Sequence, residues 1–370
     1  VAEEPRLFGA FELSRMLAGM LIFLATAAYV RSRREWTLLV VALAGAVIFE
    51  STWGLKQHFI THLGRAVGSL THANSLSMFY CLTVPVLVAC ACAGWSRWLR
   101  WFCGLATAMG TVGVLMTLSR AGIPIFALAV TGAVLTCISW RVGPGSLAVR
   151  AAILLGLAAM VAGLWTQIEG RYAGTSLEEE YFDPTVDGRG IYLRLGWMIA
   201  QEHFFGVGLN NWSYQVSRTY GPRLGYRFAD YDYLTSVYGT KDSQLFGDSY
   251  LAAPAHNLAA LTLGELGVPG LILFTLLWLR WFGMGAAFLP LSRALPMRTL
   301  AVGIFFGLAG LFGQSLTEWV YRQTPIFFLC NLLVGTLASL AARRQWERRE
   351  ARARVAAETR ADEALVAGEA

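Results

Sequence analysis

The chain has 370 residues, of which 56% are hydrophobic and 15% are charged, and its formal net charge is +6 at pH 7. A soluble protein carries roughly a quarter charged residues, so this composition excludes an ordinary soluble domain. The positive charge does not indicate nucleic-acid binding, because the basic residues stand mostly beside long apolar runs, as in membrane proteins. The runs are about 20 residues long, enough to cross a bilayer as helices, whereas a β-barrel would show short alternating segments.

The apolar runs predict an all-α polytopic membrane protein of about nine spans. They cover residues 7–30, 36–55, 70–94, 99–118, 120–140, 147–167, 256–280, 297–318 and 324–342. The arginine excess lies in alternate connections, which is typical of cytoplasmic loops. These arginines are Arg31, Arg33, Arg34, Arg97, Arg100, Arg141, Arg150, Arg280, Arg293, Arg298, Arg343 and Arg344. The chain would then start outside, with Val1, and end inside, so we expect the natural protein to have at least one further N-terminal span.

This topology divides the chain into four parts. Residues 1–167 hold six spans, 168–253 form one long external loop, 254–342 hold three spans, and 343–370 form a basic cytoplasmic tail. Within the loop, the apolar spacing of "GRGIYLRLGWMIAQEHF" predicts an amphipathic helix at the membrane interface. The glycines of "GVGLNN" are expected to end it. All six cysteines fall within spans and are expected to pack as small apolar residues.

Arg120 is the first candidate functional residue. In "TLSRAG" it joins two apolar runs through almost no loop, so both helices hold it at the membrane rim. A snorkelling side chain is the alternative, but Arg120 stands on the arginine-poor outer side. Because polar groups next to hydrocarbon are costly and usually functional, we expect Arg120 to bind a ligand.

His256 stands at the start of the seventh span, just after Pro254. The unpaired N–H groups of a helix N-terminus favour a bound anion and tend to keep an imidazole neutral, so that it can act as a base. A histidine that only caps its helix explains the position equally well. Asn257 beside it is expected to orient or cap.

Four further residues lie at the same predicted face. Arg189 and Arg194 of the interfacial helix are about 140° apart, so only one can face a site squarely, and Arg189 is favoured. His72 and Asn74, at the outer end of the third span, are interpreted mainly as a polar helix cap.

Acidic residues near the spans are expected to form pairs. Glu318 and Arg322 are predicted to brace one another, with Glu318 behind the site, and Glu12 is expected to pair with Arg15. Glu265, deeper in the seventh span, is expected to be protonated or bonded to a neighbouring helix. No P-loop, dinucleotide motif or divalent-cation motif is present in the sequence, so no metal or cofactor is expected.

Five segments, in this order, resemble the O-antigen ligase and O-antigen polymerase superfamily of bacterial envelope glycosyltransferases. They are "GSLTHANSLSMF", "LMTLSRAGIPIFAL", "GRGIYLRLGWMIAQEHFFGVGLNNW", "AHNLAALTLGELGVPGLILF" and "LTEWVYRQTPIFFL". They cover roughly residues 65–340, with the long external loop before the "HN" helix. The family usually has more spans, and usually a proline before "GVG" where this chain has "HFF". That departure leaves the choice between Arg189 and Arg194 open.

The resemblance implies a GT-C-like bundle in the bacterial inner membrane, with a metal-independent active site facing the periplasm. The implied donor is a glycan on undecaprenyl pyrophosphate, and the acceptor is lipid A-core or a second glycan. Arg120 and Arg189 correspond to the family's essential arginines and His256 to its essential histidine. The other residues expected around the substrate are Arg194, Asn257, His72, Asn74, Glu318, Arg322 and Trp212.

The chemistry of these residues suits a single displacement with inversion. Fixed guanidiniums can stabilise the diphosphate leaving group in place of Mg²⁺, while His256 deprotonates the acceptor and loop aromatic rings such as Trp212 face the sugars. A ligase is favoured over a polymerase, because no second large arginine-rich external loop is found; a protein O-oligosaccharyltransferase is a third option. A lipid or anion transporter would show broken helices at the midplane and internal repetition. Only Gly267–Gly270 interrupts a span in this way.

Overall fold

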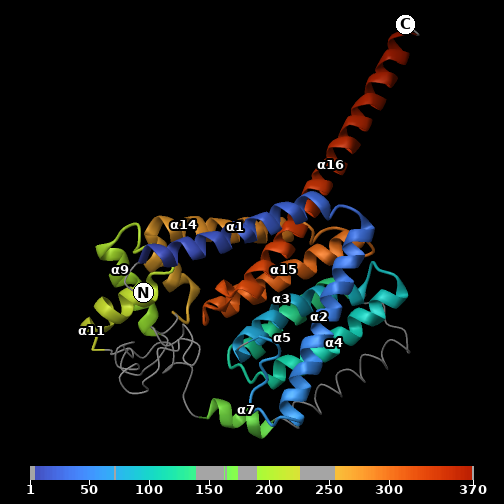
Figure 1. Ribbon diagram of the computed structural model, residues 1–370. Helices are drawn as coiled ribbons and strands as arrows, with labels where there is room; N and C mark the ends of the chain where they lie inside the picture. Colours follow the sequence, from blue (N-terminus) through green and yellow to red (C-terminus); the bar gives the residue numbers. More distant parts are fainter. Residues whose placement is uncertain are drawn as a thin grey trace.

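The computed structural model describes residues 5–70, 72–138, 162, 165–173, 190–225 and 255–368. In these residues the chain forms helices and no strand (Figure 1), which confirms the predicted helical fold for the described part. The helices are α1 (Pro5–Tyr29), α2 (Arg33–Phe59), α3 (Ala73–Cys92), α4 (Arg97–Met116), α5 (Gly122–Cys137), α7 (Trp165–Tyr172), α9 (Gly190–Glu202), α10 (Trp212–Gln215), η1 (Val216–Tyr220), α11 (Gly221–Arg223), α14 (Leu258–Ala286), α15 (Pro296–Ser315), η3 (Val320–Arg322) and α16 (Thr324–Gly368).

Seven of the described helices are long and apolar enough to cross a membrane, namely α1, α2, α3, α4, α14, α15 and α16. Helix α5 is apolar but shorter, with 16 residues. These eight match the predicted first to fifth and seventh to ninth spans. The predicted span 147–167 lies almost wholly outside the described residues. The described part of the chain is therefore that of a polytopic helical membrane protein.

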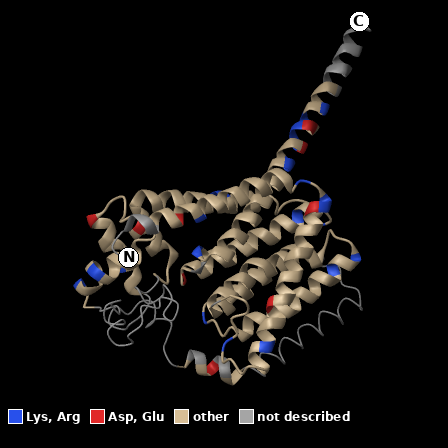
Figure 2. Cartoon of the chain, in the orientation of Figure 1, with Lys and Arg blue, Asp and Glu red and all other residues tan. Residues whose placement is uncertain are grey.

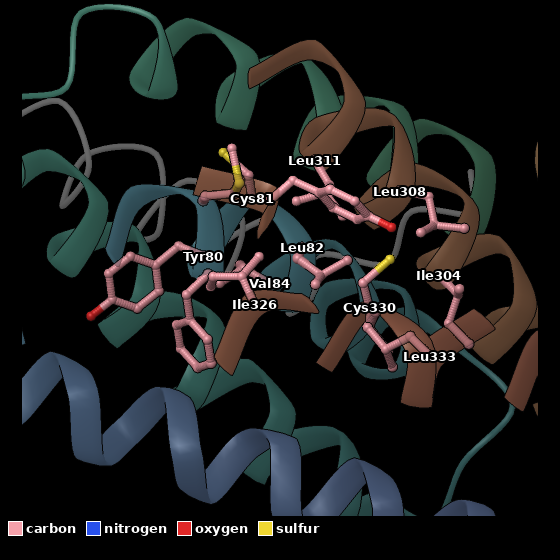
Figure 3. Close-up of a cluster of buried hydrophobic side chains, with 14 of the residues drawn as sticks. Tyr80, Cys81, Leu82, Val84, Ile304, Leu308, Leu311, Ile326, Cys330 and Leu333 are labelled. Atoms are coloured by element: carbon pink, nitrogen blue, oxygen red, sulfur yellow. The ribbon is translucent and has the colours of Figure 1, made fainter. Parts of the chain in front are cut away.

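Helix α3 forms the centre of the bundle. Its residues from Ala73 to Leu87 are all buried, and α2, α4, α5 and α15 pack around it. Figure 3 shows the apolar cluster where α3 meets α15 and α16, in which Leu82, Leu308 and Cys330 contribute fully buried side chains. Because α3 faces protein on all sides, it can carry polar residues at its first turn without exposing them to lipid.

Three glycines on α15 bring its backbone against that of α3. A methyl group at Gly303 would lie 2.6 Å from the Val86 Cα, and one at Gly310 would lie 2.8 Å from the Cys81 carbonyl oxygen. Gly307 stands between them on the same face. Small residues three and four apart allow two helices to approach closely in a membrane, where dispersion contacts drive association. This packing aligns the C-terminus of α15 with the N-terminus of α3.

Arginines gather at the end of the bundle where α16 leaves it (Figure 2), called here the arginine-rich end. Several donate to carbonyl groups at the ends of helices or in the residues that follow them: Arg100 to Ala91, Arg293 to Ile138, Arg298 to Thr136 and Leu289, Arg343 to Arg31, and Arg344 to Ala287. Such bonds satisfy carbonyls that a helix C-terminus leaves unpaired, and the positive charge complements the helix dipole. The alternate connections predicted from arginine content therefore meet at one end.

Helix α14 is broken at Gly267, where φ is 68° and ψ is −167°, a conformation essentially restricted to glycine. Pro269 also lacks the N–H that would bond the Glu265 carbonyl. The segment after α9, residues 203–208, fills the break. Its Val207 and Gly208 N–H groups donate to the Gly264 and Glu265 carbonyls at 3.0 and 2.9 Å, and the Val268 N–H donates to the Phe204 carbonyl at 3.1 Å.

The docked segment leaves no room for side chains at two glycines. A methyl group at Gly267 would lie 2.0 Å from the Phe204 carbonyl oxygen, and one at Gly206 would lie 2.4 Å from the Glu265 carbonyl carbon. Helix α9 packs on the first half of α14 through a buried face that includes Ile191, Leu195 and Ile199. The predicted amphipathic helix is therefore present, and it is joined to α14 by backbone hydrogen bonds.

Candidate active site

The candidate site lies at the end of the bundle opposite the arginine-rich end, where α3, α5 and α14 begin and α4 and α15 finish. The Nδ1 atom of His256 lies 2.9 Å from Oε2 of Glu318, just beyond the end of α15. Glu318 is 2% exposed, whereas the His256 side chain is 30% exposed. A partly exposed imidazole thus contacts a buried carboxylate.

Glu318 receives a second hydrogen bond from the first turn of α3. Asn74 Nδ2 donates to Glu318 Oε1 at 2.5 Å, and Arg65 Nη2 donates to Asn74 Oδ1 at 2.9 Å. We call the four residues Arg65, Asn74, Glu318 and His256 the Arg65–His256 chain. Both oxygens of the buried carboxylate therefore have partners, as a buried charged group requires.

The local backbone places His256 outside the helix it precedes. Its φ is 31°, a left-handed conformation that is unusual for a side chain other than glycine. The next residue, Asn257, is the N-cap of α14, with Oδ1 accepting from the Ala260 N–H at 2.9 Å and Nδ2 donating to the Leu316 carbonyl at 2.8 Å. Asn257 therefore caps α14, as expected, and also ties it to the end of α15.

The two carboxylate contacts have a chemical consequence for the imidazole. An ionised carboxylate accepts but does not donate, so with Glu318 ionised the proton in this contact is on Nδ1 of His256. In the neutral ring, Nε2 is then the atom with the lone pair. The same arrangement orients the base in hydrolases that use a serine–histidine–aspartate triad. Tyr192 of α9 lies beside the ring, with centroids 5.6 Å apart.

Arg120 stands in the turn between α4 and α5 and is partly buried. The same turn contacts the loop that carries Arg65, since Arg65 Nε donates to the Thr117 carbonyl at 2.8 Å and the Ala66 N–H donates to the Met116 carbonyl at 3.0 Å. Leu118 in this turn has a φ of 47°. The turn therefore brings Arg120 to the same end of the bundle as the Arg65–His256 chain.

The remaining predicted residues fall in different surroundings. Arg194 is exposed on α9, and Arg189 lies outside the described residues. His72 caps α3, with Nδ1 accepting from the Asn74 N–H at 3.2 Å, as expected. Trp212 is 1% exposed and its ring packs against Gly264, so the expectation that it faces a sugar is wrong in this structure.

The predicted pairing of Glu318 with Arg322 is also wrong. Arg322 is buried against α1 and α14 instead, where it donates to Glu265 Oε2 at 2.5 Å and to Glu12 Oε1 at 2.7 Å. Arg15 pairs with Glu12, as predicted, and the expected bond from Glu265 to a neighbouring element is present. This network braces helices, whereas Glu318 contacts His256 and Asn74.

Arg65 was not predicted from the sequence. Its loop is shaped by two residues of α2: Gln57 Oε1 accepts from the Val67 and Gly68 N–H groups at 3.0 and 2.8 Å, and Glu50 Oε2 accepts from the Ser69 N–H at 2.8 Å. Its position on the arginine-poor outer side, in the connection before Asn74, was the available signal. That signal is weak, because a loop arginine is usually solvated.

Comparison with known proteins gives no relative from which residue roles can be transferred. No protein-family model and no curated protein matches the chain. Among the described residues, no group of three or more histidine, cysteine, aspartate or glutamate side chains is placed to hold a metal ion. The function must therefore be argued from the geometry of the site and from the resemblance of the sequence motifs.

Proposed function

We propose that the protein is a glycosyltransferase of the O-antigen ligase and polymerase superfamily, acting on a polyprenyl-diphosphate-linked glycan at the periplasmic face of the bacterial inner membrane. The observation that carries the proposal is the contact of His256 Nδ1 with the buried Glu318. It leaves Nε2 as the acceptor atom at the end of the bundle that also holds Arg120. A base and a guanidinium at one rim suit transfer from a diphosphate leaving group.

The orientation follows from charge. Arginine-rich ends of membrane bundles face the cytoplasm, and His256 lies at the other end, so the proposed site faces outward. Lipid-linked glycans with long prenyl chains can reach such a rim from within the bilayer. A charged or polar cluster next to hydrocarbon usually serves a substrate, because keeping it there is costly.

In the proposed reaction, Nε2 of His256 takes the proton of an acceptor hydroxyl as its oxygen attacks the anomeric carbon. The bond from that carbon to the diphosphate oxygen breaks, and the diphosphate leaves with the electron pair. Arg120 stabilises the developing negative charge, and the essential-arginine motif that contains Arg189 would supply the second guanidinium. Attack opposite the leaving group inverts the configuration.

A transporter fits less well, although α14 is broken. In transporters, unwound backbone groups at a break coordinate the substrate or ion. Here the Gly264 and Glu265 carbonyls and the Val268 N–H are bonded to residues 203–208. The backbone groups at the break bond a second protein segment, so the break serves packing.

The test is a transfer assay in proteoliposomes with a lipid-linked glycan donor and either lipid A-core or a second donor molecule as acceptor. We expect transfer to lipid A-core, as a ligase performs; products elongated by repeat units would assign a polymerase. His256→Ala should lower the rate roughly 10²- to 10⁴-fold, and Arg120→Gln roughly 10²- to 10³-fold. Arg223→Gln, at an exposed pair with Glu202, is the control and should retain the wild-type rate. Full activity of His256→Ala would refute the assignment of the base.

A further inference from the structure

We propose that Arg65 and Asn74 are positioning residues that fix the tautomer and orientation of His256 through Glu318. The inference rests on the proposed function for the role of His256, and it assigns a role to Arg65, which no motif singled out. Neither Arg65 nor Asn74 is assigned a contact with the reacting atoms. They act through the carboxylate that holds the imidazole.

The chain of hydrogen bonds can run in one direction only. A guanidinium has donors and no acceptor, so the atom of Asn74 that faces Arg65 must be the oxygen. The amide nitrogen of Asn74 then faces Glu318, to which it donates. A carboxylate that accepts from Asn74 on one oxygen accepts from His256 on the other. Arg65 therefore orients the amide of Asn74 toward Glu318, and the ionised carboxylate of Glu318, which only accepts, places the proton of the neutral ring on Nδ1.

Asn74 is held too firmly to reverse its amide. Its backbone N–H donates to His72 Nδ1 at 3.2 Å, and its backbone carbonyl accepts from Gln314 Nε2 at 3.2 Å. The residue is 7% exposed. A side chain fixed at both its backbone and its amide keeps the geometry of the site before substrate arrives, which is the condition for efficient catalysis by oriented groups.

Arg65 is anchored in turn by the turn between α4 and α5. Its Nε donates to the Thr117 carbonyl, and the neighbouring Ala66 N–H donates to the Met116 carbonyl. The loop is also tied to α2 through Gln57. The positive charge of Arg65 offsets the negative charge of Glu318 across one amide, so the buried carboxylate is compensated when His256 is neutral.

The first experiment measures steady-state transfer by Arg65→Ala, Arg65→Lys, Asn74→Ala and the double variant Arg65→Ala/Asn74→Ala in proteoliposomes. We expect each alanine variant to lower kcat roughly 10- to 100-fold, with the donor KM changed less than about twofold, because only the base is misoriented. Arg65→Lys should recover part of the loss, since an ammonium can still donate to Asn74. The double variant should lose no more than Asn74→Ala alone, because both act through one contact.

Two results would overturn the inference. A rise in donor KM with unchanged kcat would make Arg65 or Asn74 a substrate-binding group, and losses that multiply in the double variant would make the two residues independent. The control is Arg223→Gln, which removes an arginine from an exposed pair and should match the wild type. Thermal unfolding of each variant in detergent identifies any that fail to fold, and Asn74→Leu and Arg65→Met, which keep the size of the side chain but cannot donate, then replace them.

A second measurement does not depend on the substrate, so it separates failure of this inference from failure of the proposed function. Nitrogen-15 NMR of protein labelled at histidine reports which ring nitrogen of His256 carries the proton. His58, His62 and His203 are replaced, and His72, which holds Asn74, is kept and its signal assigned by comparison with His72→Asn. We expect Nδ1–H to dominate in the wild type and a mixture of tautomers in Asn74→Ala. Nε2–H in the wild type, or an unchanged ratio in Asn74→Ala, would refute the positioning role even if transfer is observed. Absence of transfer by folded wild-type protein would refute only the proposed function.

Discussion

Glu318 and His256 are 62 positions apart in the chain, yet Oε2 of the first lies 2.9 Å from Nδ1 of the second. The contact depends on the packing of α14 against α15 and on the cap that Asn257 forms across their ends. It gives the partly exposed ring a buried carboxyl partner. The proposed function therefore depends on a residue that is itself 2% exposed.

Glu318→Gln tests this relationship while keeping the size of the side chain. The amide can donate to Nδ1, which favours the ring tautomer with its proton on Nε2, and the corresponding change in a serine–histidine–aspartate triad is severely damaging for this reason. We expect transfer to fall at least roughly 10-fold, with little change in thermal stability. Glu347→Gln, in an exposed pair with Arg343 on α16, should have no effect on transfer. Equal rates for Glu318→Gln and the wild type would show that His256 needs no oriented proton.

Alanine at Gly267 or Gly206 should destabilise the fold severely. Both residues have positive φ, and a methyl group at either would meet backbone atoms that cannot move without breaking the docked segment. Strain of this kind costs roughly 1–3 kcal/mol before any clash is counted. Thermal unfolding in detergent should show the loss, together with lower yield.

Gly283→Ala is the matched control in the same helix, because nothing lies within 4 Å of the added methyl group. There we expect unchanged stability or a gain of roughly 0.5–1 kcal/mol, since alanine favours a helix over glycine. If Gly267→Ala unfolded at the same temperature as Gly283→Ala, the docking of residues 203–208 into α14 would be disproved.

The buried network around Arg322 predicts that removing the positive charge of this residue lowers the stability of the fold strongly. Arg322→Met leaves Glu265 and Glu12 without their shared partner, and breaking a buried pair in this way costs about 3–5 kcal/mol. The double variant Glu265→Gln/Arg322→Met restores the balance, because Glu12 keeps its pair with Arg15. We expect its melting temperature to recover most of the loss. A double variant no more stable than Arg322→Met would show that packing by the guanidinium, and not its charge, holds α1 to α14.

The contact of Glu202, at the end of α9, with Tyr220 predicts that the local stability of η1 depends on pH. The Tyr220 hydroxyl donates to it at 2.9 Å, and this bond, followed by that of Arg223, lowers the pKa of Glu202 below its ordinary value of 4.5. A lowered folded pKa means that the contact is fully present above pH 4.5 and is lost as the pH falls through the lower value. Burial, followed by the same hydrogen bond, raises the pKa of Tyr220 to about 12.

Hydrogen-exchange protection factors of η1 measure this contact. We expect them to be constant from pH 8 to pH 5 and to fall in more acidic solution in the wild type. In Glu202→Gln the protection of η1 should be as low at every pH as that of the wild type in acid, because an amide carries no negative charge. Equal protection in the two proteins at neutral pH would contradict the contribution of this contact.

The helical bundle could be predicted from the sequence because hydropathy and arginine bias act along the chain. The described spans match the prediction to within a few residues, with two exceptions. Helix α14 extends to Ala286, six residues beyond the predicted end, and α16 continues from its predicted span 324–342 through the basic tail to Gly368. The amphipathic spacing of residues 190–202 also predicted the helix α9. These properties depend on the composition of each segment, so they need no knowledge of packing.

The site was predictable only in part. Arg120, Asn74, His256 and Glu318 stood out as polar groups at one predicted rim, and they do gather at one end. The partners of these residues could not be predicted from the sequence, because helix packing decides which carboxylate contacts which cation. Arg322, four positions after Glu318, pairs with Glu265. Trp212 was misjudged for a similar reason, since a loop aromatic residue packs inward when Gly264 provides a flat surface.

The three backbone hydrogen bonds between residues 203–208 and the break in α14 limit how the molecule can rearrange. A helix interrupted by glycine and proline would ordinarily serve as a hinge, but these bonds lock the interruption. Bending there would strand three peptide groups away from water, each at a cost of roughly 1–3 kcal/mol. Helix α9 and the part of α14 before Gly267 must therefore move as one rigid body. Under the proposed function, His256 and Tyr192 would therefore keep their spacing while a bulky substrate entered past other elements.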